Sequence, residues 1–178
     1  MVESLEKQDP SNAIDNSSEI VRESLLGHKG SVESLELTTG LSIVPDGLLS
    51  ASEDGTARIW DLRTNKGVVL LKPEGASTNE IQRAAFGANC DYPIVATASG
   101  ETLSFFDLRK PSLILKSTKI GLDESFKTSE FHSEDINDVT IQSTAKGFKV
   151  ASCDDTGLTV VQDINVLEGE SGDKSLLT

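Results

Sequence analysis

The chain has 178 residues, with 16 Lys and Arg against 29 Asp and Glu, and a formal net charge of −13. Phosphate backbones are bound through clustered cations, so this charge argues against a nucleic-acid partner. No stretch approaches the roughly 20 apolar residues of a membrane-spanning helix, and the acidic N-terminus lacks the apolar core of a signal peptide. We therefore expect a cytoplasmic or nuclear protein, or one found in both, that binds neither nucleic acid nor membranes.

The N-terminal segment, residues 1–19, is rich in Ser, Asn and acidic residues, a composition typical of disorder. A short helix that begins near Ser11 or Asn12 is the alternative, with Ile14 and Ile20 as its apolar contacts. Residues 20–26, with the sequence IVRESLL, predict a strand that precedes the first repeat.

A repeated pattern begins with the Gly-His pair at His28 and is clearest over residues 48–63, LLSASEDGTARIWDLR. A β-run ends in Ser52, and a second one ends at Trp60 and the aspartate after it. Gly55, in the turn between them, can take a positive φ, which favours a hairpin. The small and apolar residues of both runs suit a sheet that is packed on both faces.

Two weaker copies follow. The second, residues 94–109, reads IVATASGETLSFFDLR, and the third begins at His132 and includes VASCDDTGLTVVQD. The closing aspartates lie 107 − 61 = 46 and 163 − 107 = 56 positions apart. The first spacing is near the roughly 40–45 residues of a known repeat class, and the second requires an insertion, which we place at residues 116–131.

The Gly-His opening, the turn aspartate and the Trp-Asp closure resemble the WD-repeat (WD40-type) β-propeller family. The stretches ASGETLSFFDLR, HSEDINDVTI and VASCDDTG resemble, in this order, the second and third repeats of one member. The resemblance implies an all-β fold. We expect a partial propeller over residues 20–166, an open arc of about three four-stranded blades, and a disordered tail over residues 167–178. The predicted blades span about residues 27–72, 78–117 and 131–166.

Propellers close with about four to eight blades, so three blades leave an open arc. We expect that the chain is a truncated or alternative product, or a partial gene model, whose missing blades lay beyond Thr178.

The resemblance also implies a buried hydrogen-bonded tetrad. The indole would donate, the hydroxyl and the imidazole would relay, and the carboxylate would accept. The implied tetrad residues are His28, Ser52, Asp54 and Trp60. A His–Asp pair also occurs in catalytic triads, but the structural tetrad accounts for this pair better.

Other features of catalysis are weak. No glycine-rich phosphate loop follows a strand. Cys90 and Cys153 form no CxxC pair, lack an obvious base partner and are expected to be buried free thiols. Asp154 and Asp155 could suggest a metal, yet a hairpin turn explains the pair. We therefore predict that the chain is not an enzyme, and that it has no catalytic, cofactor-binding or metal-binding residues and no cofactor.

The segment from Trp60 to Arg63 resembles the Trp-Asp-x-Arg motif of WD-repeat receptors of cullin-4 RING ubiquitin ligases, and residues 106–109 are a second copy. The resemblance implies docking on the DNA-damage-binding adaptor of these ligases. We predict a non-catalytic protein-interaction module that acts as such a substrate receptor. The alternatives are a general WD-repeat scaffold, for example a chromatin or complex-assembly factor, and a truncated product without independent activity. The implied adaptor-binding residues are Trp60, Asp61, Arg63, Asp107 and Arg109.

Overall fold

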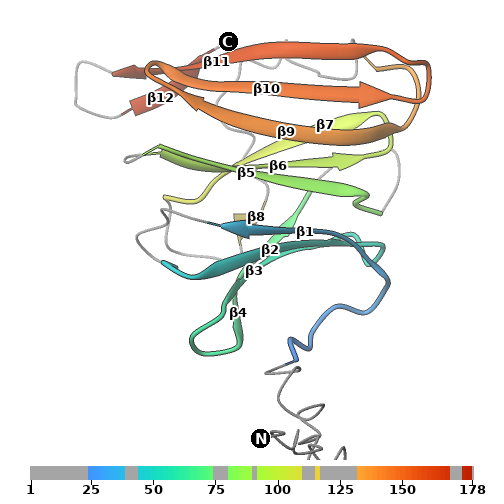
Figure 1. Ribbon diagram of the computed structural model, residues 1–178, viewed down its shortest axis with the longest axis vertical. Helices are drawn as coiled ribbons and strands as arrows, with labels where there is room; N and C mark the ends of the chain where they lie inside the picture. Colours follow the sequence, from blue (N-terminus) through green and yellow to red (C-terminus); the bar gives the residue numbers. More distant parts are fainter. Residues whose placement is uncertain are drawn as a thin grey trace, which may run out of the picture.

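The computed structural model describes residues 24–38, 44–73, 80–89, 92–109, 115–116, 132–168 and 174–177. This part of the chain consists of β-strands and their connections, so the all-β prediction is confirmed (Figure 1). It contains no helix that could span a membrane. The expected disordered segment and its alternative helix lie outside the described residues, and residues 24–26 of the predicted strand are not in a strand.

The first sheet contains four consecutive antiparallel strands, in the order β1-β2-β3-β4, and a fifth strand at the β4 edge. Gly55 has a φ of 77° in the turn between β2 and β3, the conformation for which a glycine was expected there. The strands are β1 (Val32–Thr38), β2 (Gly47–Ser52), β3 (Ala57–Asp61) and β4 (Lys66–Lys72).

The second sheet has three strands, β5 (Arg83–Asn89), β6 (Tyr92–Ser99) and β7 (Thr102–Asp107). The described residues thus give this sheet three strands, against the four expected of a complete blade. The short strand β8 (Leu115–Lys116) pairs in parallel with β4 of the first sheet instead. Pro111 lies in the sequence between β7 and β8, and a proline cannot donate a ladder hydrogen bond.

The third sheet has the order β12-β11-β10-β9. Its strands are β9 (Ile136–Thr144), β10 (Gly147–Asp154), β11 (Thr159–Glu168) and β12 (Lys174–Leu177). The end of β11 and all of β12 fall in the tail that we expected to be disordered, so this expectation is wrong for those residues. β12 forms an antiparallel ladder with β11 from Asn165 to Glu168, and such pairing overrides a composition poor in strand formers.

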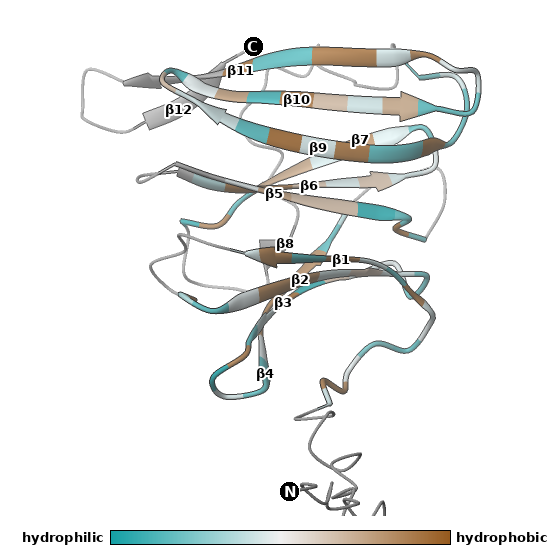
Figure 2. Ribbon diagram, in the orientation of Figure 1, coloured by the Kyte–Doolittle hydropathy of each residue, from teal (hydrophilic) through white to brown (hydrophobic). Residues whose placement is uncertain are grey.

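The three sheets stack face to face in chain order, with the first at the bottom and the third at the top of Figure 1. Hydrophobic and hydrophilic residues alternate along several strands, as expected for side chains that point to opposite faces (Figure 2). One core, which includes Leu49, Ile59 and Phe106, lies between the first two sheets, and another, which includes Phe105 and Phe148, lies between the second and third. The second sheet is thus covered on both faces, whereas among the described residues no further sheet covers the outer faces of the first and third.

The pairing register defines equivalent positions in the three sheets. Trp60 lies opposite Leu48, Phe106 opposite Val95, and Gln162 opposite Val150. Phe106 belongs to the core toward the first sheet, and Val150 to the core toward the second. The second and third sheets therefore each turn the face of the closing residue toward the sheet that precedes it in the chain.

Candidate functional site

The first sheet contains a hydrogen-bonded tetrad. The Trp60 indole Nε1 donates to Ser50 Oγ at 2.8 Å, and His28 Nε2 lies 2.7 Å from the same oxygen. His28 Nδ1 lies 3.0 Å from Asp54 Oδ2. These contacts form one continuous chain when His28 carries its proton on Nδ1, because the Ser50 hydroxyl then donates to Nε2.

The tetrad serine is Ser50, so the prediction of Ser52 is wrong. Both serines lie on one face of β2, but Ser50 is opposite Arg58 and thus next to Trp60 across the ladder. Ser52 lies beyond the last residue pair of β2 and β3, where its hydroxyl accepts the amide hydrogen of Asp54 at 3.1 Å.

Asp54 anchors the opening of the repeat to the hairpin turn. Its carboxylate accepts the backbone amides of Lys29 at 2.8 Å and Thr56 at 2.9 Å, and also the Thr56 hydroxyl. Burial raises the pKa of Asp54, but the hydrogen bonds from Thr56, Lys29 and His28 outweigh it and hold the pKa well below its ordinary value. The carboxylate is therefore ionised at neutral pH.

The third sheet has an equivalent triad that the sequence analysis missed. His132 Nδ1 lies 2.9 Å from Asp154 Oδ2, and His132 Nε2 lies 2.7 Å from Ser152 Oγ. Hydrogen bonds from the Thr156 hydroxyl and from His132 lower the pKa of Asp154 to about 2. We had assigned Asp154 to the turn alone, although a histidine at the repeat opening and an aspartate in the turn were the same signal as in the first repeat.

The position of the tetrad tryptophan is occupied by other residues in the second and third sheets. Gln162 stands at the Trp60 position in the third sheet, and its buried Oε1 has no hydrogen-bond partner. In the second sheet, Phe106 replaces the tryptophan and Thr97 occupies the position of Ser50, with its buried hydroxyl unpartnered. The complete tetrad is thus confined to the first sheet in the described part of the chain.

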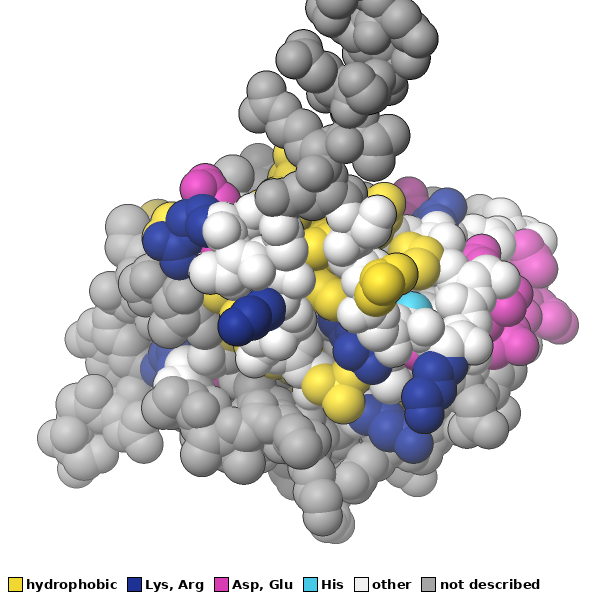
Figure 3. All heavy atoms as spheres, turned by 90° about the horizontal axis from the view of Figure 1, so that it is seen from below, with side chains coloured by type: hydrophobic (Ala, Val, Ile, Leu, Met, Phe, Trp, Pro, Cys, Tyr) yellow, Lys and Arg dark blue, Asp and Glu magenta, His cyan; other side chains and the backbone are white. Residues whose placement is uncertain are grey.

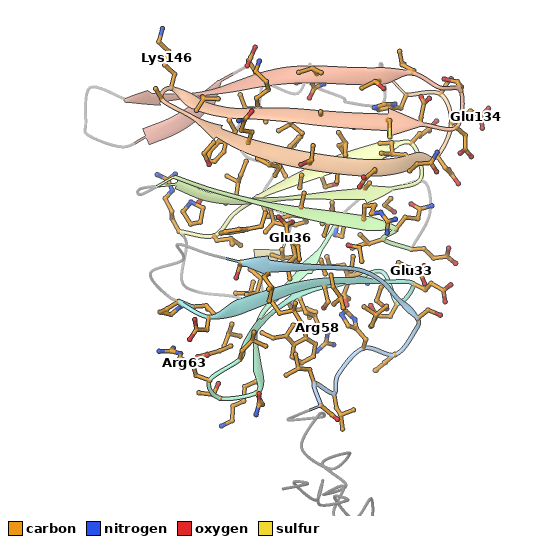
Figure 4. All side chains as sticks on the ribbon, in the orientation of Figure 1. Glu33, Glu36, Arg58, Arg63, Glu134 and Lys146 are labelled. Atoms are coloured by element: carbon orange, nitrogen blue, oxygen red, sulfur yellow. The ribbon has the colours of Figure 1, made fainter. Side chains whose placement is uncertain are left out.

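Two Asp–Arg pairs lie at the ends of β3 and β7, and we call them the first corner (Asp61 and Arg63) and the second corner (Asp107 and Arg109). At the first corner, Arg63 Nε and NH2 donate to the two carboxylate oxygens of Asp61 at 3.1 and 2.9 Å. Arg63 lies at the strand end of the first sheet, beside the turn into β4 (Figure 4). This bond from Arg63 lowers the pKa of Asp61 and raises the pKa of the arginine.

The second corner repeats this geometry. Arg109 Nε and NH2 lie 3.1 and 2.8 Å from Asp107 oxygens, and the backbone amide of each arginine donates to its aspartate at 2.9 Å. The aspartate side chains are about 10% exposed, whereas Arg63 and Arg109 are 52% and 29% exposed. The sequence analysis named these residues, and the structure shows that each aspartate holds its arginine in a two-bond fork.

The third corner lacks an arginine. Its aspartate, Asp163, forms an exposed ion pair with Lys149 of β10 at 2.6 Å, and Asn165 stands two residues after it. The repeated pair therefore belongs to the first two sheets.

The described residues contain no group of three or more His, Cys, Asp and Glu that could hold a metal ion. Cys153 is a free, half-buried thiol, and Cys90 lies outside the described residues. The two imidazole side chains and the serines that they contact are buried, and their hydrogen bonds join the opening of each repeat to its hairpin.

The stacked sheets, the tetrad and the Trp-Asp closure define a WD-repeat protein with the β-propeller fold. The chain is 33% identical over 146 residues to the WD repeat-containing protein 53 homolog of Dictyostelium discoideum, which confirms the narrower resemblance. This match covers 82% of the chain but only 35% of that protein, so the chain spans about a third of the relative's length. It is also 33% identical over 66 residues to ribosome biogenesis protein YTM1 of Eremothecium gossypii, covering 37% of the chain and 14% of that protein.

No family model matches the chain. Among solved structures, a chain of the humanized mutant of Chaetomium thermophilum Polycomb Repressive Complex 2 bound to the inhibitor GSK126 is similar, with a TM-score of 0.60 and 23% identity. The match covers 85% of this chain and 32% of that one. The WD40 β-propeller domain of Doa1 has a TM-score of 0.53 and 21% identity, covering 78% and 38%. These two likenesses support the fold alone.

Proposed function

We propose that this WD-repeat protein-interaction module acts, in the cytoplasm or the nucleus, as a substrate receptor of a cullin-4 RING ubiquitin ligase. It docks on the DNA-damage-binding adaptor of the ligase through the first and second corners. The observation that carries this proposal is the repeated Asp–Arg geometry at equivalent positions of two adjacent sheets. A substrate receptor requires no catalytic group of its own.

Preorganisation supports the assignment. A free arginine loses rotamer freedom when it docks, which costs roughly 0.5–1.5 kcal/mol per side chain. Here the aspartates already fix both guanidinium groups, and Arg63 keeps half of its surface exposed. A guanidinium in this state can donate its remaining hydrogens to a carboxylate or to carbonyl groups of a partner.

The test is co-purification of the adaptor with the full chain and with the double variant Arg63→Ala and Arg109→Ala. We expect loss of the adaptor from the double variant. Lys149→Ala is the matched control, because it removes one cation at the third corner, and it should leave adaptor binding unchanged. Thermal unfolding of each variant separates loss of docking from loss of the fold.

A folded double variant that still binds the adaptor would overturn the proposal. Other stable protein partners that are insensitive to both arginines, together with the absence of ligase subunits, would favour a general WD-repeat scaffold instead.

A further inference from the structure

An exposed carboxylate, that of Asp46, lies beside the first corner, immediately before β2. The backbone carbonyl of Asp46 accepts the amide hydrogen of Leu62, the residue between the two members of the corner, at 2.9 Å. Its side chain forms no hydrogen bond or ion pair in the part of the chain that the structure describes. The fold therefore uses the main chain of Asp46 and leaves its charge without a partner.

The second corner makes the same main-chain contact without the charge. Leu108, the equivalent of Leu62, donates its amide hydrogen to the carbonyl of Pro93 at 3.1 Å. The β2–β3 and β6–β7 ladders place the two acceptors at equivalent positions, each one residue before the residue that lies opposite the corner aspartate. A proline ring thus stands where the first corner has a carboxylate. The contact does not require an acid, because both corners make it.

Asp46 is close enough to the first corner to act on its charge. The hydrogen bond and the charge of Asp61 raise the pKa of Arg63, and the charge of Asp46 raises it further. Among the described residues, the side chain of Arg63 donates to Asp61 alone. These three residues carry two negative charges and one positive charge, a net charge of −1. Lys66, opposite Asp61 in the β3–β4 ladder, forms no ion pair with either aspartate in the described part of the chain.

Asp46 also stands apart from the main acidic surface of the molecule. The largest group of acidic side chains in Figure 3 lies on the side of the hairpin turns, where Glu33 and Glu134 are labelled in Figure 4. Arg63 is labelled at the opposite end of the strands. A basic partner that responded only to the net charge of −13 would be attracted to the turns. A carboxylate beside Arg63 instead offers a cation a defined position at the first corner.

We propose that Asp46 is a third docking group of the first corner, which binds a lysine or arginine side chain of the partner while Arg63 donates to an acceptor on the same partner. This inference rests on the proposed function and adds to it. The adaptor presents a cation at the first corner and none at the second, where Pro93 stands. Such unlike corners fix the orientation of the partner, because charges that must meet their complements set the register of an interface.

The experiment measures the Kd of the purified adaptor for the full chain and for three variants by isothermal titration calorimetry. It is done at about 0.1 M and at about 1 M salt, where the screening length is about 10 Å and about 3 Å. Asp46→Asn removes the charge and keeps a side chain that suits a turn, and Asp46→Lys reverses the charge. Glu134→Gln is the matched control, because it also removes one exposed carboxylate charge but lies at the opposite end of the strands.

At the lower salt concentration, we expect Asp46→Asn to weaken binding about two- to fivefold, the range of an exposed ion pair. Asp46→Lys should weaken it about tenfold or more, because like charges then meet. Glu134→Gln should bind as the unmodified chain does. The differences should disappear at about 1 M salt, because the charges are then screened. Circular dichroism verifies that each variant is folded.

An Asp46→Lys variant that binds as tightly as the unmodified chain would overturn the inference, and so would a loss in Asp46→Asn that Glu134→Gln shares. A loss that persists at about 1 M salt would contradict it as well, because a changed turn and not a missing ion pair would then explain the loss. In these cases, binding that still depends on Arg63 and Arg109 leaves the proposed function standing. An unmodified chain that does not bind the adaptor would overturn both.

Discussion

Replacement of Ser50 by alanine tests the tetrad most directly, because Ser52 offers a matched control two residues away on the same strand face. Ser50→Ala removes the acceptor of the buried Trp60 indole and the partner of His28 Nε2. A buried polar group that loses its partner costs about 1–3 kcal/mol. The indole bears most of this penalty, since Trp60 is 3% exposed, and His28 adds a smaller part. We expect a loss of about 2–4 kcal/mol in the free energy of unfolding.

Ser52→Ala removes one hydrogen bond, from the Asp54 amide at the turn, so we expect a loss of about 1 kcal/mol or less. The assay is urea unfolding followed by circular dichroism. Trp60 fluorescence in the native state is a second readout. Of the two variants only Ser50→Ala should change it, because of the two serines only Ser50 accepts the hydrogen bond of the indole. Equal losses for both variants, or a larger loss for Ser52→Ala, would refute the assignment of Ser50 to the tetrad.

Three further predictions follow from buried groups. The carboxyls of Asp54 and Asp154 have lowered pKa values in the folded chain. The stability that they contribute is therefore present above the unfolded pKa of about 4 and is lost as the pH falls toward about 2. The urea concentration at the unfolding midpoint should fall between pH 5 and pH 2.5, and it should fall less steeply in the variant Asp154→Asn. Thr97→Val replaces an unpartnered hydroxyl by a methyl group and should leave the free energy of unfolding unchanged or raise it by about 1 kcal/mol, so a clear loss in urea unfolding would contradict the orphan hydroxyl. Gly87→Ala would push a Cβ against Ile141 and the Phe148 ring of the third sheet, and calorimetry should show a loss of about 1–3 kcal/mol.

The sequence predicted those parts of the fold that depend on local chemistry. The hairpin at Gly55 follows from residues close together in the chain, and the structure contains it. The family resemblance implied Asp54 as the tetrad carboxylate, and its contact with His28 is present. The motif named Asp61, Arg63, Asp107 and Arg109 as adaptor-binding residues, but it did not predict that each aspartate pairs with its own arginine. The sequence could not show that the tetrad serine is Ser50 and not Ser52. Both serines occupy one strand face, and only the pairing with β3 decides which one reaches Trp60. The strand β12 and the parallel contact of β8 likewise depend on pairing between distant segments, which composition does not reveal.

The second sheet keeps the buried packing of the tetrad's tryptophan position although it lacks the tetrad. Phe106 cannot donate a hydrogen bond, yet its ring is 1% exposed in the core shared with the first sheet. Phe105, next to it, is buried in the core shared with the third sheet. Full burial of one such side chain stabilises a fold by roughly 1.5–3 kcal/mol, which matches or exceeds the net contribution of one or two hydrogen bonds. Phe106 thus keeps the burial of the Trp60 position, which is 3% exposed in the first sheet, without its hydrogen bond. Within the described part of the chain, the His–Ser–Asp hydrogen bonds are kept in the first and third sheets, which each pack on one neighbouring sheet.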